Sequence, residues 1–167
     1  MPWPRSGVLI VGLLLILGAC SHKPKKDHIE ARNNGVVLDI ELPGWEFVET
    51  NAANRTFLYH QGKQQLYLSV SRYKRTDAVS PDENAVRDAL LDICETKTCV
   101  PRQMKSGIWV STYATGTTQV PVKNWDAAKL TPKGEMLVSV LRLVYASKES
   151  AAQIDAAVEK SLILERD

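Results

Sequence analysis

The sequence lacks an excess of charge of either sign, and this absence limits the kind of partner. It carries 21 Lys and Arg residues against 19 Asp and Glu residues. A nucleic-acid-binding protein shows a clustered basic excess, so we expect no nucleic-acid partner. One basic cluster, Lys23-Pro24-Lys25-Lys26, fits either attraction to anionic lipid headgroups or a solvated linker, and we favour the linker.

Motifs of catalysis and metal binding are also scarce. The sequence has neither a Gly-x-Ser-x-Gly element nor a glycine-rich phosphate loop. Its three histidines are His22, His28 and His60, whereas a metal site usually needs three or four convergent ligands. His22 and His28 with Asp27 and Glu30 would make at most a loose metal site. We therefore expect a protein that is not an enzyme and holds no cofactor or metal.

The N-terminal apolar stretch is too short to be a typical membrane span. It runs from Val8 to Ala19, which is 12 residues, whereas a spanning helix needs about 20. Arg5 precedes it, the small residues Gly18 and Ala19 end it, and a hydrophilic stretch follows. This combination predicts a secretory signal peptide over residues 1–19. A transmembrane anchor and an ordinary cleaved signal are the alternatives.

The run Leu17-Gly18-Ala19-Cys20 resembles the lipobox of bacterial lipoproteins. The resemblance implies that residues 1–19 are removed and that Cys20 becomes the first residue of the mature protein, acylated with chains such as palmitate. Two or more acyl chains hold a protein stably to a membrane. In Gram-negative members, serine after the cysteine usually permits transport to the outer membrane. Ser21 therefore implies the inner leaflet of the outer membrane, facing the periplasm, with the inner membrane as the alternative.

The mature chain has the length of one domain. Removal of 19 of the 167 residues leaves 148, which fits a single domain. Residues 20–35 contain almost nothing apolar and cannot bury enough surface to offset their chain entropy. We expect them to form the lipidated cysteine and a flexible basic tether, followed by one globular domain over residues 36–167.

Cys94 and Cys99 remain once Cys20 is assigned to the anchor. An oxidising compartment favours a disulfide between them. Residues five apart in a continuous helix have Cα atoms about 8.6 Å apart, whereas a disulfide tolerates little beyond about 7 Å. A helix that contains Cys94 must therefore end before Cys99. A redox-active pair is the weaker alternative, because the spacing differs from that of Cys-x-x-Cys.

Strands are predicted wherever apolar and polar residues alternate. The apolar run 135–146 has apolar residues on both faces, which indicates a central strand covered on both sides. The proline-interrupted segment 119–125 favours an edge strand. The alternating strands are expected at 36–42, 55–60, 65–73 and 107–116.

Two helices are expected between and after these strands. Ser80-Pro81-Asp82-Glu83 fits a capping box with Ser80 as the N-cap, and this helix should end at Cys94 or Glu95. Ser147 should cap a last helix with an apolar stripe of Ala151, Ile154, Val158 and Leu162. The element order predicts an α+β fold, with a mostly antiparallel sheet of about six strands packed with two helices.

This order, with Leu42-Pro43-Gly44-Trp45 ending the first strand, resembles the Mog1/PsbP-like sandwich and the periplasmic lipoproteins of the DcrB type. The resemblance spans roughly residues 36–164. It implies a protein that binds or assists other proteins, since few members are enzymes. It assigns no functional residue here.

Aromatic residues mark the best candidate for a partner-binding face. Tyr67 and Tyr73 share one face of a predicted strand, and Trp109 and Tyr113 share one face of another. If these strands are neighbours, the four side chains form an amphipathic patch of the kind that anchors protein interfaces. The alternative, which we weigh more heavily, is that a helix covers this face or that the rings stiffen the sheet as cross-strand pairs.

The sequence therefore predicts a membrane-anchored periplasmic lipoprotein that acts as a non-catalytic protein-binding or envelope-assembly factor. The alternative is an immunity lipoprotein that neutralises a toxin directed to the periplasm, for example by a type VI secretion system. An enzyme or a carrier of a small ligand is less favoured, because it would need a deep pocket that no motif indicates.

Overall fold

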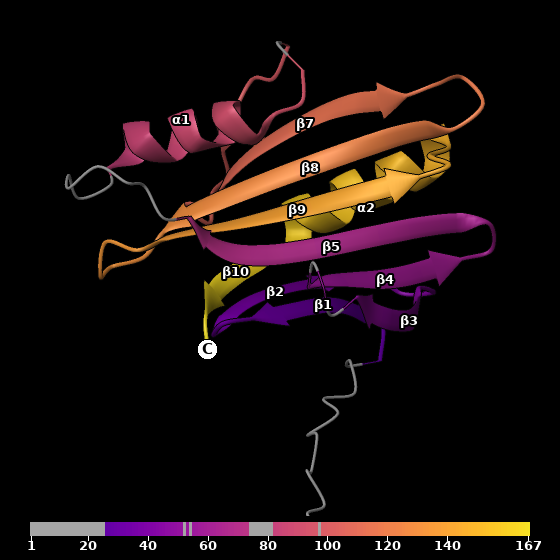
Figure 1. The fold of residues 1–167 in the computed structure, drawn as a ribbon, viewed down its shortest axis with the longest axis horizontal. Helices are drawn as coiled ribbons and strands as arrows, with labels where there is room; N and C mark the ends of the chain where they lie inside the picture. Colours follow the sequence, from indigo (N-terminus) through magenta and orange to yellow (C-terminus); the bar gives the residue numbers. More distant parts are fainter. Residues whose placement is uncertain (1–25, 52, 54, 74–81, 97) are drawn as a thin grey trace, which may run out of the picture.

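The computed structural model describes residues 26–51, 53, 55–73, 82–96 and 98–167. These residues form two helices and ten strands in two antiparallel sheets (Figure 1). The predicted α+β class is confirmed, but the predicted count of about six strands is too low. Cys20, the predicted signal peptide and the residues Lys23-Pro24-Lys25 of the basic cluster lie outside the described residues.

The larger sheet has seven strands, and the predicted central strand does lie at its centre. From one edge to the other they are β3 (Glu46–Asn51), β4 (Thr56–Gln61), β5 (Gln64–Tyr73), β9 (Met136–Val144), β8 (Pro121–Leu130), β7 (Trp109–Gly116) and β6 (Arg102–Gln103). The prediction of an edge strand over 119–125 is wrong, because β8 lies between β9 and β7. Pro121 is its first residue, a position in a strand that tolerates proline.

The smaller sheet has three strands, and two of them fall where none is predicted. They are β1 (His28–Asn33), β2 (Val36–Glu41) and β10 (Ile163–Arg166), with β2 in the middle. The predicted tether over residues 20–35 is therefore wrong for residues 28–33. Ile29 and Ala31 alternate on one face of β1 and are fully buried. These two apolar residues are enough to place β1 in the core, because β1 is also hydrogen-bonded to β2 along its whole length.

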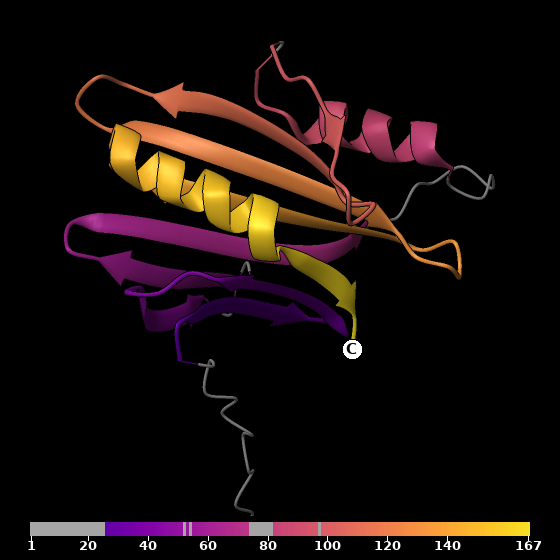
Figure 2. The same cartoon turned by 180° about the vertical axis from the view of Figure 1, so that it is seen from behind.

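One face of the larger sheet, here the inner face, packs against both the smaller sheet and α2 (Lys148–Ser161), as Figure 2 shows. Ser147 caps α2 as predicted, because its side chain accepts a hydrogen bond from the Ser150 amide. Trp125 of β8 is 1 % exposed and donates from Nε1 to Asp155 Oδ1 of α2 at 2.6 Å. The main core fills this interface with Leu38, Ile40, Leu66, Leu68, Leu141, Leu143, Ile154 and Val158.

The opposite, outer face carries α1 (Glu83–Ile93) over only part of its length (Figure 1). A second apolar cluster lies beneath α1, where Val86, Ala89 and Leu90 pack with Ala128, Met136 and Val138. The helix begins after Asp82, whose side chain accepts from the Ala85 amide, so the prediction of Ser80 as the N-cap is wrong. Asp82 does what Ser80 was expected to do, because its carboxylate also accepts hydrogen bonds from the first turn.

Neither described helix has the length and apolar composition of a membrane span. The longer of the two, α2, has 14 residues.

Candidate functional site

A cavity of about 480 Å³ opens on the outer face of the larger sheet, beside the C-terminal end of α1. Figure 1 shows α1 beside β7 and β8, at the end of the sheet where β8 ends and β9 begins. The cavity lies on the adjoining part of the sheet. Its lining comes from β4, β5, β7, β8, β9 and the residues at the end of α1, and comprises Thr56, Tyr67, Leu68, Ser69, Ile93, Glu95, Tyr113, Asp126, Val140 and Arg142.

Strand register places Asp126 in one row of neighbours across this face. Asp126 of β8 lies opposite Ser111 of β7 on one side and Val140 of β9 on the other. Val140 in turn lies opposite Ser69 of β5. Because alternate residues of a strand point to opposite faces, Asp126 points outward between the inward residues Trp125 and Ala127, which both belong to the main core.

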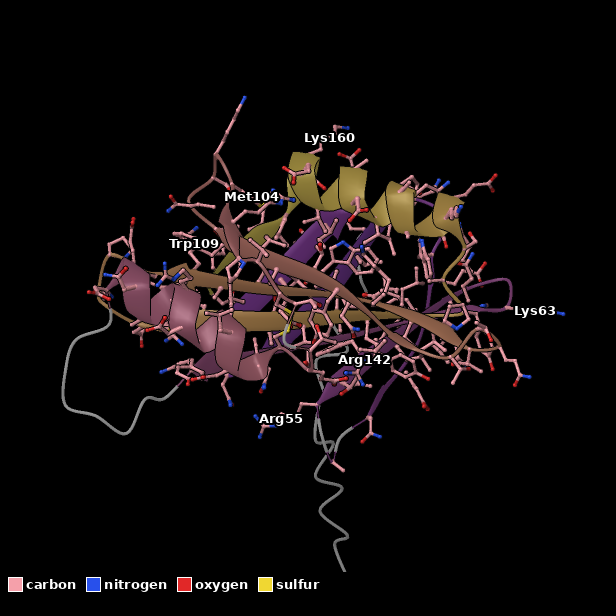
Figure 3. All side chains as sticks on the ribbon, turned by 90° about the horizontal axis from the view of Figure 1, so that it is seen from above. Arg55, Lys63, Met104, Trp109, Arg142 and Lys160 are labelled. Atoms are coloured by element: carbon pink, nitrogen blue, oxygen red, sulfur yellow. A yellow bond between two sulfur atoms is a disulfide. The ribbon has the colours of Figure 1, made fainter. Side chains whose placement is uncertain are left out.

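The next row brings a charged residue between two tyrosines. Arg142 of β9 lies opposite Tyr67 of β5 and Asn124 of β8, and Asn124 lies opposite Tyr113 of β7. The Nε of Arg142 donates to Asn124 Oδ1 at 3.0 Å, and Asn124 Nδ2 donates to Thr115 Oγ1 at 3.0 Å. Arg142 also forms an ion pair with Glu95. Figure 3 shows Arg142 on the side of the sheet that carries α1.

Asp126 is the electrostatically unusual residue of this site. It is 0 % exposed, and neither carboxylate oxygen accepts a hydrogen bond of ordinary length and angle from any described residue. Burial away from water raises the pKa of Asp126 to about 6, from an ordinary value of 3.8, although Tyr113 and Arg142 both act to lower it. The neighbouring Ser111 hydroxyl is also buried and lacks a partner among the described residues.

Tyr113 experiences the same low-dielectric surroundings. It is 6 % exposed. Burial raises the pKa of Tyr113 to about 12, and the nearby Asp126 carboxylate adds to this increase. The phenol therefore remains protonated at neutral pH and can serve as a hydrogen-bond donor or acceptor.

The loop closed by the disulfide between Cys94 and Cys99 lies at one wall of the cavity. The structure joins Cys94 to Cys99, with their Cα atoms 6.5 Å apart. As the spacing predicts, the helix stops first: α1 ends at Ile93, and Cys94 has extended backbone angles. Ile93 and Glu95, on either side of Cys94, both line the cavity. The pair therefore fixes the turn that presents Glu95 to Arg142.

Replacement of both cysteines, Cys94→Ser with Cys99→Ser, should lower stability modestly. The closed loop is short, so the chain-entropy model gives about 2 kcal/mol, or a fall in melting temperature of roughly 5 °C. Thermal unfolding with and without reductant measures it, and reduced wild type should match the double variant. An equal wild-type melting temperature under oxidising and reducing conditions would contradict the disulfide.

The four aromatic residues predicted to form one patch occupy two places. Tyr67 and Tyr113 line the cavity. Tyr73 and Trp109 pack beside α1, and the Tyr73 hydroxyl donates to Asp92 Oδ2 at 3.4 Å. The condition for a continuous patch is not met, because β9 and β8 separate β5 from β7. For Tyr73 and Trp109 the alternative interpretation, cover by a helix, is therefore the correct one.

Sequence reasoning missed the charged residues of the site. Asp126, Arg142 and Glu95 carry its electrostatics, and none of them belongs to a known motif. A signal was nevertheless present: Arg142 is the one charged residue between Met136 and Tyr145, and Asp126 stands between Trp125 and Ala127. A charged side chain within a mostly apolar strand costs free energy unless it is paired with an opposite charge and hydrogen-bonded. Such a residue is therefore a candidate for a functional role.

The histidines lie elsewhere. His28 Nδ1 and Asp39 Oδ1 are 2.7 Å apart on the smaller sheet, and His60 Nε2 lies 3.3 Å from Glu46 Oε2 at an exposed position. His22 lies outside the described residues. Within the described part of the chain, no group of three His, Cys, Asp or Glu side chains is placed to hold a metal ion.

Comparison with known proteins adds no residue to this site. No protein-family model matches the chain, and no curated protein matches its sequence. What the site can bind is therefore derived from its own geometry and charge.

Proposed function

We propose that this protein is a lipid-anchored lipoprotein of the bacterial envelope that binds a protein partner through the cavity on the outer sheet face. The observation that carries the proposal is Asp126, a buried carboxylate that accepts no hydrogen bond of ordinary length and angle from a described residue and interacts only weakly with the Tyr113 hydroxyl, at a cavity flanked by Tyr67 and Tyr113. Buried polar groups in native proteins are nearly always hydrogen-bonded. An exception at a cavity is typical of a site that is completed by a ligand or partner.

Anchoring at Cys20 would keep this cavity close to the membrane. Because β1 begins at His28, only eight peptide steps separate the proposed anchor from the folded domain. A fully extended chain of that length reaches roughly 28 Å at most. The proposed site of action is the periplasmic side of the outer membrane, as Ser21 suggests, and a partner in or near that membrane lies within this reach.

The chemistry of the cavity favours binding over catalysis. Acid–base catalysis usually needs two groups whose environments divide the roles of acid and base. Asp126 has a pKa of about 6, but the pKa of Tyr113, about 12, is too high for proton exchange near neutral pH. Glu95 is held in an ion pair by Arg142. The sequence resembles the Mog1/PsbP-like proteins, whose members mostly bind or assist other proteins, and this resemblance favours the same role.

Site-specific photo-crosslinking in living cells tests this proposal. A photoreactive amino acid in place of Tyr67, in the full-length anchored chain, should give a discrete adduct with a partner. The matched control replaces Lys160, whose side chain is 76 % exposed on α2 at the opposite side of the molecule (Figure 3). Lys160 should give no such adduct. Equal labelling at both positions, or none at Tyr67, would contradict the proposed site.

The identity of the crosslinked partner separates the two kinds of binding protein. An envelope component would assign an assembly or accessory role. A secreted toxin would make this protein an immunity lipoprotein, with the same site and the same anchor.

A further inference from the structure

We propose that the cavity receives a cationic group, an alkylammonium or a guanidinium, which pairs with Asp126. This inference rests on the proposed function and specifies the chemistry that the partner must present. It follows from four observations: the net charge of the cavity lining, the Asp126 oxygens that lack ordinary hydrogen bonds, the aromatic side chains of the lining and the partial exposure of Arg142.

The charges of the cavity leave one carboxylate uncompensated. Glu95, Asp126 and Arg142 are the residues of the lining whose side chains carry charge. The guanidinium of Arg142 is committed to Glu95 through Nη2 and to Asn124 through Nε. Once Asp126 is ionised, the site therefore has a net charge of −1 and attracts a cation. An anion would have to displace Glu95 and would meet Asp126 as well.

The missing hydrogen bonds are those that a donor-only group supplies. Neither oxygen of Asp126 accepts a hydrogen bond of ordinary length and angle from a described residue, although the Tyr113 hydroxyl interacts with this carboxylate, and Ser111 Oγ beside them is unpartnered too. An ammonium brings three donors and a guanidinium five, and neither accepts. Burial of a charge is tolerated when the charge is paired and hydrogen-bonded. A cationic ligand would meet this condition for itself and for Asp126 together.

The remaining walls suit the rest of a basic side chain. Tyr67 and Tyr113 offer aromatic rings, which attract cations through their faces. Ile93 and Val140 add apolar surface, against which the methylene stem of a lysine or arginine can pack. The volume of about 480 Å³ falls within the range of small-ligand sites. It therefore has room for such a side chain and its neighbours.

Entry to Asp126 requires a side chain of the lining to move, and Arg142 is a partly exposed member of that lining. Asp126 is 0 % exposed although it lines the cavity. The side chains of Arg142 and Glu95 are 39 % and 50 % exposed, and ion pairs at such exposed positions contribute little to stability. An incoming cation can therefore displace the Arg142 guanidinium from Glu95 towards solvent, and the cation must also offset the loss of the Nε hydrogen bond to the buried Asn124.

Titration of the full-length chain in detergent with small organic ions tests the inference. The cationic probes are n-butylammonium and ethylguanidinium chloride, and sodium butanoate is the matched anion. Two-dimensional NMR should show saturable shifts of cavity residues, with dissociation constants of about 1–10 mM, as expected for fragments of this size. Asp126→Asn should weaken cation binding at least about tenfold. Butanoate should cause no saturable change.

Two results would overturn the inference: cation binding that Asp126→Asn leaves unchanged, or butanoate binding more tightly than the cations. The outcome is separable from the proposed function. A Tyr67 adduct without cation binding would leave partner binding standing and remove only the cationic contact. Cation binding without the adduct would show a site for a free amine. If n-butylammonium competes with the Tyr67 adduct, the cation is supplied by a basic side chain of the partner.

Discussion

Replacement of Cys20 by alanine is expected to remove all lipid from the protein and to move it out of the outer-membrane fraction. Acylation requires the cysteine thiol, so the variant cannot receive the chains that the lipobox implies. The effect should be all-or-none, because the variant carries no acyl chain. Even a single chain binds membranes only marginally, at about 10⁴ M⁻¹, whereas two or more anchor a protein stably. Incorporation of labelled palmitate and separation of inner from outer membranes measure it.

Controls make this result specific to Cys20. The variant Cys94→Ser with Cys99→Ser should keep the full palmitate label, because these residues form the internal pair. Globomycin, which blocks removal of the lipoprotein signal, should cause the wild-type chain to accumulate with residues 1–19 still attached. If the alanine variant keeps its label or its place in the outer membrane, Cys20 is not the anchor.

Local patterns predicted those elements whose own sequence decides their structure. β5 alternates over ten residues, and its inward residues Leu66, Leu68 and Val70 are all buried as predicted. α2 has both a strong N-cap at Ser147 and an apolar stripe, and it forms where expected. In each case hydrophobic periodicity and end signals agree, and such agreement makes a segment predictable without knowledge of its neighbours.

Elements that depend on distant partners were harder to predict. β1 contributes only Ile29 and Ala31 to the core and becomes a strand by pairing with β2. A local signal existed in Asn34-Gly35, whose backbone angles φ of 52° and 70° fit a type I′ hairpin turn. β10, at the C-terminal end, pairs with β2 near the start of the domain. No local window of sequence contains both members of that pair.

The candidate site was unpredictable for the same reason. Its residues converge only because β9 lies between β5 and β8, which places Arg142 beside Tyr67 and Asn124. The sequence shows which strand face each residue occupies but not the order of the strands. Tyr67 and Tyr113 could therefore be singled out by residue type, whereas Asp126 and Arg142 gained their meaning from tertiary register.

Substitution of Asp126 by asparagine should stabilise the fold at high pH while it weakens binding. The pKa of Asp126 is raised by burial to about 6, from 3.8. The folded state therefore holds a proton that the unfolded chain has lost between about pH 4 and pH 6, and wild-type stability falls as the pH rises through this window. The ionised carboxylate costs about 3 kcal/mol above it. A buried amide keeps part of that cost, so we expect a net gain of about 1–2 kcal/mol.

Denaturant unfolding at about pH 3 and about pH 8 measures this difference, because the gain should disappear where both states bind the proton. Tyr113, Arg142 and Glu95, the groups that interact with this carboxylate, are unchanged in the variant. The matched control is Asp88→Asn, an exposed position on α1, which should alter stability by less than about 0.5 kcal/mol. A variant less stable than wild type at high pH would show that the ionised carboxylate is already satisfied within the fold. A gain in stability together with a loss of cation binding would mean that Asp126 is kept for its ligand at a cost to the fold.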